Sequence, residues 1–433
     1  MNGRLLAINN YHYRRGGADA IFLDQMDMFA RAGWQAVPFS MQHPDNLPTE
    51  WSSYFVPEIE FGHQGGILTK IGHGIEVIYS RKARRSLSAL IDRVRPDVAH
   101  AHNVYHHISP AIFPLLKHRG IPTVMTVHDL KLACPSYKML APDGVCERCK
   151  GGRIHNVLLH RCMKGSVALS GLVMVETAVH RALRLYRDHI DRLVVPSRFY
   201  RNKLMEWGWP SEKLVYIPNF VEHAISKQRL QADEGDYFLF AGRLAPEKGV
   251  ATLIRAVARA KKRLLVAGTG PEQASLQALA REEGADVQFL GYLSGAALHE
   301  TVAGAKALVL PSEWYENAPV SLLEAYALGR PVIGTDIGGI PELIQPDHTG
   351  LIARSGDPDD LARVLAKMDA LSAAERKQMG AHGRAWVEQD FSRQAFFDRT
   401  LDLYRELGVS RPTDPVRDVR RGKRDADGSI LSI

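Results

Sequence analysis

The chain has 433 residues, more than one ordinary hydrophobic core contains, so two or three domains are expected. Apolar residues make up 45% and charged residues 24%, which excludes a largely disordered chain. No apolar run approaches the roughly 20 residues of a membrane span, and the first residues lack the pattern of a signal peptide. We therefore expect a cytoplasmic protein.

The net charge of +7 is unevenly distributed along the chain. Residues 1–220 contain 28 Lys and Arg against 18 Asp and Glu, so the first half is basic and the rest is mildly acidic. This asymmetry predicts two domains with different partners. The basic half could face anionic lipid, nucleic acid or phosphorylated substrates, or be an ordinary solvated surface.

Short β-rich runs alternate with helical patterns along the chain. In the first half, strands are expected at 4–9, 34–39, 97–102, 123–128 and 192–196, with a helix at 18–32. A second series of strands is expected at 237–241, 263–267, 287–291, 307–311 and 331–335, separated by helices such as 249–260 and 319–328. The pattern from 358 to 407 is helical throughout. Such alternation predicts two α/β domains with parallel sheets.

The joint between the two series is expected near 217–221, which predicts an N-terminal domain at 1–218 and a C-terminal domain at 219–390. A final helix should follow at 391–409. Residues 410–433 contain two prolines and a basic run but few apolar side chains, so this tail is expected to be disordered.

A glycine pair, Gly16 and Gly17, stands between the first strand and the first helix. Ligands of α/β sheets bind at the carboxyl ends of strands, and a helix start offers free N–H groups to an anion. The pair is thus a candidate phosphate contact, although glycine pairs also occur in ordinary turns.

The loop Ala241-Gly-Arg-Leu-Ala-Pro-Glu-Lys-Gly249 directly follows the first strand of the second series. It places Arg243 and Lys248 in one loop before a helix. The planar fork of arginine and the point charge of lysine together suit a diphosphate.

A third motif, Glu313-Trp-Tyr-Glu-Asn-Ala-Pro-Val-Ser-Leu-Leu-Glu324, follows the strand at 307–311. Pro319 suits the first turn of a helix, so Glu316 should lie in the loop and Glu324 inside the helix. Backbone N–H groups of 317–321 could face an anion. The two carboxylate oxygens of Glu324 could accept hydrogen bonds from both hydroxyls of a ribose.

Together these motifs resemble glycosyltransferase family 4, which has the GT-B fold, and the resemblance covers about residues 3–405. Glu316-x7-Glu324 matches the family's E-x7-E motif, and residues 242–249 match its donor loop G-R-(x)n-K-G. Further similar segments are Val195-Pro-Ser-Arg198, Ile217-Pro-Asn219, Gly268-Thr-Gly-Pro271 and Gly338-Gly-Ile-Pro-Glu342.

The resemblance implies an α/β fold with two Rossmann-like domains facing across a cleft and a C-terminal helix returning to the N-terminal domain. It implies a retaining transferase that needs no cofactor for catalysis. The donor would be a nucleotide-diphosphate sugar of UDP or GDP type, bound by the C-terminal domain. The acceptor would be a glycan or a lipid-linked molecule, bound by the N-terminal domain, in surface or exopolysaccharide biosynthesis.

The resemblance also implies roles for individual residues. The catalytic set would be Glu316 beside the transferred sugar, His128 at the donor sugar, and Arg243 with Lys248 on the diphosphate. The donor-binding set would be Gly16, Gly17, Arg243, Lys248, Asn317, Ala318, Pro319, Val320, Glu324 and Tyr292. The family displaces the leaving group on the same face as the acceptor attacks, so no side-chain general base is assigned. Asn317 departs from the family pattern, because many relatives have glycine there.

Four histidines, at positions 100, 102, 106 and 107, crowd the end of the strand at 97–102 and the loop after it. A metal cluster is conceivable because histidine is a common ligand. Donor or acceptor contacts in a cleft are a second interpretation, and ordinary hydrogen-bonded histidines are a third.

The four cysteines of the chain are Cys134, Cys146, Cys149 and Cys162. A close pair flanked by two single cysteines suits tetrahedral zinc bound by four thiolates. Two disulfides are a second interpretation, which a cytoplasmic location disfavours, and four free thiols are a third. We expect a structural zinc site in the insertion 134–162, near the acceptor entrance.

A basic helical segment at 79–91 is compatible with peripheral contact at the inner face of a membrane, and equally with a solvated helix face. Among rival functions, a phosphorylase would need a lysine that binds pyridoxal phosphate, and no sequence feature indicates one. A sugar-nucleotide epimerase and a non-catalytic protein that keeps the fold are two more rival functions. Nucleic acid is not expected as a partner, because no recognisable nucleic-acid motif is present.

Overall fold

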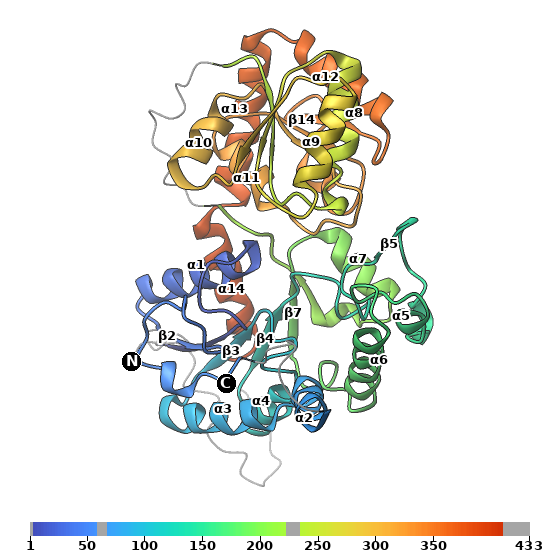
Figure 1. Cartoon of the computed structure of the whole chain (residues 1–433). Helices are drawn as coiled ribbons and strands as arrows, with labels where there is room; N and C mark the ends of the chain where they lie inside the picture. The colour runs from blue at the N-terminus through green and yellow to red at the C-terminus, as the bar shows by residue number, and fades with distance from the viewer. Residues whose placement is uncertain (1–2, 59–66, 222–233, 410–433) are drawn as a thin grey trace, which may run out of the picture.

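The computed structural model describes residues 3–58, 67–221 and 234–409 and shows two bodies stacked on one another (Figure 1). The lower one, the N-terminal body, is built on a parallel six-stranded sheet in the order β2-β1-β3-β4-β7-β8. Its strands are β1 (Arg4–Ile8), β2 (Gln35–Phe39), β3 (Val98–Ala101), β4 (Thr123–Thr126), β7 (Arg192–Val195) and β8 (Leu214–Tyr216).

The upper, C-terminal body is built on a second parallel sheet in the order β11-β10-β9-β12-β13-β14. Its strands are β9 (Phe238–Ala241), β10 (Leu264–Ala267), β11 (Val287–Gly291), β12 (Leu308–Leu310), β13 (Val332–Thr335) and β14 (Gly350–Ala353). The expected two α/β sheets are thus confirmed. β8 and β14, the last strand of each sheet, were not predicted.

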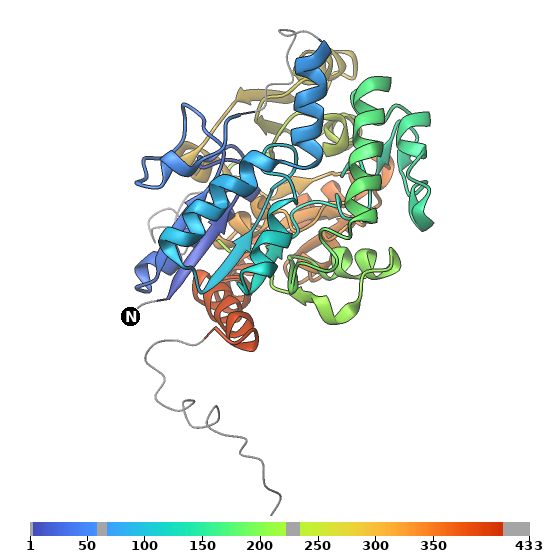
Figure 2. The ribbon, with the colours of Figure 1, turned by 90° about the horizontal axis from the view of Figure 1, so that it is seen from below.

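Helices cover both faces of each sheet. In the N-terminal body they are α1 (Gly17–Arg31), α2 (Ile67–Ile78), α3 (Arg81–Val94), α4 (Ile112–His118), α5 (Asn156–Leu159), α6 (Val167–Ala182) and α7 (Arg198–Glu206). The later helices are α8 (Val250–Ala260), α9 (Gln273–Glu282), α10 (Gly295–Ala303), α11 (Val320–Ala327), α12 (Pro358–Ala370), α13 (Ala373–Asp390) and α14 (Arg393–Glu406). Seen from below, α5, α6 and α7 gather along one flank, opposite the side on which the chain begins (Figure 2).

The strands are buried on both faces, which explains their continuous apolar runs. In β1, Leu5, Leu6, Ala7 and Ile8 are all at most 3% exposed. Leu6 and Ile8 belong to the cluster on one face of the sheet, and Leu5 and Ala7 to the cluster on the other. Successive side chains therefore serve two separate cores.

The last helix, α14, runs down from the C-terminal body and packs beside α1 in the N-terminal body (Figure 1). The rings of Phe29 and Phe397 have centroids 4.9 Å apart, and those of Phe29 and Tyr404 are 5.4 Å apart. The expected return of the C-terminal helix is confirmed. The predicted disordered tail, 410–433, lies outside the described residues.

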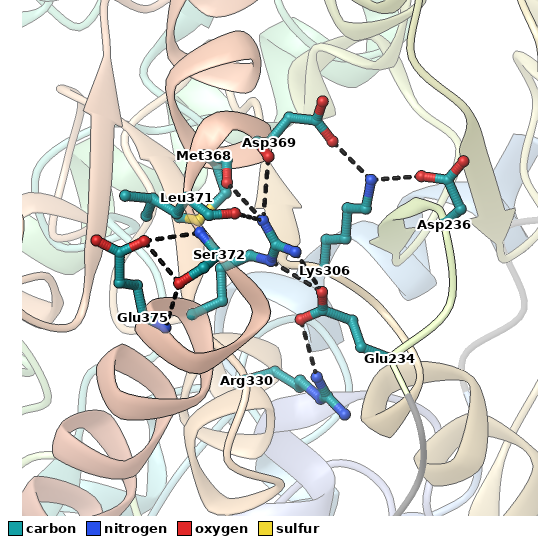
Figure 3. Close-up of polar contacts among 10 residues, drawn as sticks. Glu234, Asp236, Lys306, Arg330, Met368, Asp369, Leu371, Ser372 and Glu375 are labelled. Atoms are coloured by element: carbon teal, nitrogen blue, oxygen red, sulfur yellow. Dashed lines mark hydrogen bonds and ion pairs between the residues drawn. The ribbon is translucent and has the colours of Figure 1, made fainter.

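Ion pairs, some of them partly buried, hold the start of the C-terminal body to its helices (Figure 3). Lys306 Nζ lies 2.6 Å from Asp369 Oδ1 at the end of α12 and also pairs with Asp236. Arg376 donates from Nε to Glu234 Oε1 at 2.9 Å and from a terminal nitrogen to the carbonyl of Met368 at 3.1 Å. These contacts fix the segment that leads into β9.

The basic helix at 79–91 corresponds to α3, whose apolar side is not available to lipid. Leu87, Leu90 and Val94 are at most 4% exposed and pack into the core of the N-terminal body. Within the described part of the chain, no helix is both long enough and apolar enough to cross a bilayer. Any membrane contact through α3 would therefore depend on its basic side chains.

Candidate functional site

The loop after β9 lies where the strand order of the C-terminal sheet reverses, because β9 is flanked by β10 and β12. Open α/β sheets bind ligands at the carboxyl ends of such strands. The loop reaches α8 through Gly249, whose φ of 67° favours glycine. A Cβ there would lie 1.9 Å from the carbonyl oxygen of Pro311. Glycine therefore allows the loop to approach the segment that follows β12.

This approach brings Lys248 into direct contact with Glu316. Lys248 Nζ lies 2.6 Å from Glu316 Oε1, and the Ser312 hydroxyl donates to the same oxygen at 2.8 Å. Glu316 is 7% exposed, so its carboxylate is held in a largely buried position. Two residues that the sequence assigned to the catalytic set thus meet in one site.

Arg243, the other predicted diphosphate contact, is more exposed than Lys248 and pairs with Glu247. Glu247 is buried at 3% exposure and also faces Lys138 Nζ, 3.4 Å away. Lys138 belongs to the N-terminal body, so this carboxylate joins the two bodies. The sequence analysis did not single out Glu247, although its position four residues after Arg243 could have suggested the pair.

A cavity of about 390 Å³ lies between the two bodies, bounded by α1 on one side and α11 on the other. The predicted residues that line it are Gly16, Gly17, Val320 and Glu324. A Cβ built on Gly17 would meet nothing within 4 Å among the described residues. The absent side chain of Gly17 thus leaves room for a ligand rather than for neighbouring protein atoms.

Glu324 lies in the second turn of α11 and faces this cavity. Burial raises the pKa of its carboxyl group to about 7. Its ionised form offers two acceptor oxygens, which suits the neighbouring hydroxyls of a ribose. The protonation state of this group therefore changes in the neutral pH range.

Asn317 connects the loop before α11 to the N-terminal body. Its amide nitrogen donates to the carbonyls of Val127 and His128, at 3.0 and 3.3 Å, and its amide oxygen accepts from the Ser197 hydroxyl at 2.8 Å. Glycine at this position would lack all three contacts. The departure from the family pattern is thus an interdomain contact in this structure.

The next three predicted residues continue the same segment. Ala318 is buried, and its carbonyl accepts from the Asn219 side chain at 2.9 Å. Pro319 caps the start of α11 with extended backbone, and Val320 begins the helix. The helix start therefore lies beside the cavity, as a donor-binding segment requires.

His128 is held by a chain of hydrogen bonds that begins on α1. The amide oxygen of Gln25 can only accept, so His102 Nε2 donates to it at 2.8 Å. His102 is neutral because burial lowers its pKa well below 6.5, so its Nδ1 accepts. His128 Nε2 then donates to His102 Nδ1 at 2.8 Å. This arrangement fixes the tautomer of His128 and leaves its Nδ1 as an acceptor.

The same chain extends to the C-terminal helix through His100. Gln25 Nε2 and the Tyr404 hydroxyl both approach His100 Nδ1, at 2.9 and 2.7 Å, and His100 Nε2 lies 2.7 Å from the Thr126 hydroxyl. Burial lowers the pKa of His100 to about 3 and that of His128 to about 4. These histidines therefore stay neutral at physiological pH.

The other two histidines of the predicted cluster are placed differently. His106 Nδ1 lies 3.7 Å from the buried carboxylate of Glu176, and the His107 ring packs edge-on against Tyr11. The ring of His100 stacks on that of His102. Residues 100–107 thus contain two stacked histidines that both bond to Gln25, and two histidines with other neighbours.

Tyr292, assigned to donor binding, follows β11 and is 74% exposed. It does not line the cavity between α1 and α11. Tyr292 therefore does not share that cavity with Gly16, Gly17, Val320 and Glu324.

The four cysteines are all free thiols, which rules out disulfides in this structure. They line one small cavity together with Trp207. Burial raises the pKa of the Cys149 thiol to about 12, and the neighbouring thiols add to this effect. The sequence prediction that the insertion brings all four together is consistent with this cavity.

The donor set of four thiols is chemically suited to zinc, but its geometry is not. In the described ranges, no group of three or more His, Cys, Asp or Glu side chains is placed to hold a metal ion. Among the described residues the structure thus shows neither an assembled zinc site nor a metal site at the histidines. Metal binding by the thiols would require the sulfur atoms to move closer together.

Comparison with known proteins places both bodies in one family. The family model described as Glycosyltransferase Family 4 matches residues 15–224, and that described as Glycosyl transferases group 1 matches 221–386. Side by side, the two models span most of the chain.

Two relatives illustrate the similarity. A GDP-mannose-dependent monoacylated alpha-(1-6)-phosphatidylinositol monomannoside mannosyltransferase of Corynebacterium glutamicum is 34% identical over 37% of this chain and 45% of its own length. The amylovoran biosynthesis glycosyltransferase AmsK of Erwinia amylovora is 25% identical over 66% of this chain and 78% of its own. The chain thus spans less than half of the first relative and about three quarters of the second.

The fold is shared with solved structures along nearly the whole chain. Sucrose-phosphate synthase from Thermosynechococcus elongatus superposes with a TM-score of 0.68 and 21% identity, covering 94% of this chain and 99% of the other. The matching family models, the relatives and this fold agree with one another. The chain therefore belongs to glycosyltransferase family 4 and is a glycosyltransferase with the GT-B fold.

Proposed function

We propose that the protein is a retaining glycosyltransferase that moves a sugar from a nucleotide-diphosphate donor, of UDP or GDP type, to a glycan or lipid-linked acceptor. The observation that carries this proposal is the direct contact of Lys248 with Glu316, whose motif continues into α11 and ends at Glu324, a residue that lines the interdomain cavity together with Gly17. A cation and a helix start suit a diphosphate, and an open glycine leaves it room. Carboxylates suit the hydroxyl groups of a sugar and of a ribose.

In this proposal the C-terminal body binds the donor and the N-terminal body, residues 1–218, binds the acceptor. Arg243 and Lys248 would leave their carboxylate partners to pair with the diphosphate. Their charges would stabilise the negative charge that develops on the leaving group, which is often the largest catalytic contribution. The neutral His128, with Nδ1 as an acceptor, would receive a hydrogen bond from a hydroxyl of the donor sugar.

Surface or exopolysaccharide biosynthesis is the proposed biological setting. The role of the Erwinia relative in amylovoran biosynthesis supports it, and the GDP-mannose dependence of the Corynebacterium relative supports a nucleotide-sugar donor. Contact with the inner face of a membrane would then depend on the basic side of α3.

The stereochemical test is proton NMR of the product formed from an α-linked nucleotide sugar and a defined acceptor. Retention predicts an α-anomeric coupling in the first product detected. A β-anomeric product would contradict the retaining assignment while leaving the transferase class intact. Conversion of the donor without any acceptor would instead favour an epimerase.

The structural zinc is also kept as a proposal, supported by the convergence of four thiols on one cavity and by the Arg148 guanidinium, which lies 3.8 Å from Cys146 Sγ and could offset thiolate charge. Metal analysis of protein purified without chelators should find about one zinc per chain. A Cys146→Ser, Cys149→Ser variant should lose it. Protein with no zinc would contradict the proposal.

A further inference from the structure

A cavity of about 640 Å³ lies on the flank where α6 and α7 gather, within the N-terminal body (Figure 2). Its wall is formed by the 3-10 turn Lys150–Gly152, the C-terminal end of α6 with the residues after it, and the end of α7. Its described lining shares no residue with the cavity that contains Gly17 and Glu324. This space, the flank cavity, is therefore separate from the transfer site.

Positive charge dominates the flank cavity. Five of its fifteen lining residues are Lys or Arg, against a single lining carboxylate, Glu206, which pairs with Lys150 at 3.3 Å. Lys131 and Arg184 also pair with carboxylates outside the lining, Glu176 and Asp188. Arg181, Arg184 and Arg187 follow one another at intervals of three residues, and all three are exposed. Arginine forks bind carboxylate and phosphate groups in a bidentate manner, so the wall is suited to an acidic ligand.

Two polar atoms in the wall lack partners. Tyr186 is 8% exposed, and its buried hydroxyl has no hydrogen-bond partner in the part of the chain that the structure describes. The same holds for the buried indole nitrogen of Trp207. Nearly all buried polar groups in proteins are hydrogen-bonded, so such exceptions need an explanation. Both atoms are themselves shielded from solvent, so a ligand in the cavity would contact the rings of these residues and not these two atoms.

The aromatic part of the wall suggests what kind of molecule carries the acidic groups. Trp207 and Trp209 both line the cavity, and the indole nitrogen of Trp209 donates to the carbonyl of Leu132 at 3.3 Å, which holds its ring in place. Indole faces pack well against the C–H faces of sugar rings. The volume lies within the range of small-molecule sites, about 300–1,000 Å³, and could hold roughly two to three sugar rings.

We propose that the flank cavity binds an acidic saccharide, a short sugar chain that carries carboxylate or phosphate groups, at a place distinct from the site of glycosyl transfer. Charged groups would pair with the three arginines, and sugar rings would pack on the tryptophans. The proposal does not depend on the identity of the donor or of the acceptor.

Calorimetric titration with trigalacturonic acid tests the proposal. Maltotriose, which has the same number of rings and no charge, and inorganic pyrophosphate, which has charge and no rings, should each bind at least about tenfold more weakly. The double variant Arg184→Ala, Arg187→Ala should weaken trigalacturonate binding by tenfold or more. Arg405→Ala is the matched control, because Arg405 is likewise exposed and pairs with a nearby aspartate, and it should change nothing.

A second variant separates a ligand contact from a fold defect. Trp207→Phe keeps an aromatic ring but reduces the face on which a sugar ring can pack, and should weaken binding roughly threefold with an unchanged melting temperature. Arg243→Ala should leave trigalacturonate binding intact while it impairs nucleotide binding. The failure of one site can thus be told from the failure of the other.

Three results would overturn the proposal. The first is no trigalacturonate binding by the wild type, and the second is binding that the double arginine variant does not weaken. The third is pyrophosphate, or vesicles of phosphatidylglycerol, binding as tightly as the saccharide and with the same dependence on Arg184 and Arg187. That outcome would mean that the wall recognises charge alone.

Discussion

His102 Nδ1 lies 2.8 Å from His128 Nε2, and this hydrogen bond leaves Nδ1 of the neutral His128 as the acceptor. The bond depends in turn on Gln25, which accepts from His102 Nε2. Gln25 in α1, which is distant in the sequence, therefore fixes both the position and the tautomer of His128.

If His102 orients His128, replacing it should lower turnover more than donor affinity. His102→Ala should reduce kcat about 10–100-fold with a change in donor KM below about threefold, because a misplaced group costs rate when the reacting geometry is lost. His102→Asn, whose side-chain oxygen can accept from His128, should recover most of the activity. Equal losses in the two variants, or a loss confined to KM, would show that His102 does not act through His128.

Replacing Gly17 by alanine should leave the fold intact but weaken donor binding. Gly17→Ala should leave the melting temperature within about 2 °C of the wild type, because its Cβ meets no described atom within 4 Å. It should nevertheless raise the donor Kd at least about tenfold, since the methyl group occupies ligand space. Gly72→Ala is a matched control, because Gly72 is equally open but lies in α2. Unchanged donor affinity in Gly17→Ala would show that Gly17 does not lie against the bound donor.

Lys248 should contribute to both stability and catalysis through Glu316. Lys248→Ala leaves a largely buried carboxylate without its cation, which should cost about 1–3 kcal/mol of unfolding free energy. It should also lower kcat by roughly 10²–10³, the usual effect of removing one charge-stabilising donor. Adding Glu316→Gln should restore the stability but not the activity. Denaturant unfolding and initial rates on the wild type and the two variants measure these effects. Stability that stays low in the double variant would contradict the pairing.

Donor binding should strengthen as pH rises through neutrality. The pKa of Glu324 is raised to about 7, so the group is mostly protonated at pH 6 and mostly ionised at pH 8. If the ionised form accepts both ribose hydroxyls, donor affinity should increase up to about tenfold over this range. A nucleotide sugar is the proper ligand, because its diphosphate does not titrate there. Glu324→Gln should give a flat profile, and a wild-type profile just as flat would exclude this role.

Acid should destabilise the protein through its buried histidines. Burial lowers the pKa values of His100 and His102 in the folded state, whereas both titrate near 6.5 when unfolded. Below pH 6.5 the unfolded chain binds more protons, so the free energy of unfolding falls by up to roughly 1.4 kcal/mol per pH unit for each group. His100→Asn should reduce the proton uptake on unfolding between pH 6 and 4.5 by about one. An unchanged uptake would show that His100 is charged in the folded state.

Most of the fold was predictable because parallel strands buried on both faces give continuous apolar runs. β8 and β14 were missed for a physical reason. β8 has only three residues, and β14 follows a turn at 346–349, with no long apolar run to mark either one. The last strands of a sheet are held by one neighbour and by helices, so their own sequence carries little signal.

Site residues that belong to one short sequence motif could be predicted. Contacts between residues that are far apart in the sequence could not. Glu316 and Glu324 share one motif, and Lys248 lies in another. In contrast, no sequence spacing indicates that Asn317 binds the backbone at His128, or that Glu247 faces Lys138. Such contacts arise from the packing of two bodies, which local patterns do not encode.

The histidines and the cysteines show that residue types alone do not predict whether a metal is bound. Histidines 100 and 102 crowd together as a metal site would, yet they form a neutral hydrogen-bonded chain with Gln25 and Tyr404. The four thiols converge as their spacing predicts, but not in a geometry that holds a metal. Residue type indicates which chemistry is available, and only the packing decides which is used.

The measurement that tests the central claim most directly is the change in thermal stability of the protein with UDP, GDP, ADP and their sugar conjugates, for the wild type, Arg243→Ala and Glu324→Ala. A ligand at about 100 times its Kd should stabilise the wild type by roughly 2.7 kcal/mol. The account predicts such a shift for one nucleotide and its sugar conjugate, strongly reduced in both variants. No shift with any nucleotide, or a shift that both variants retain in full, would contradict a donor site at Arg243 and Glu324.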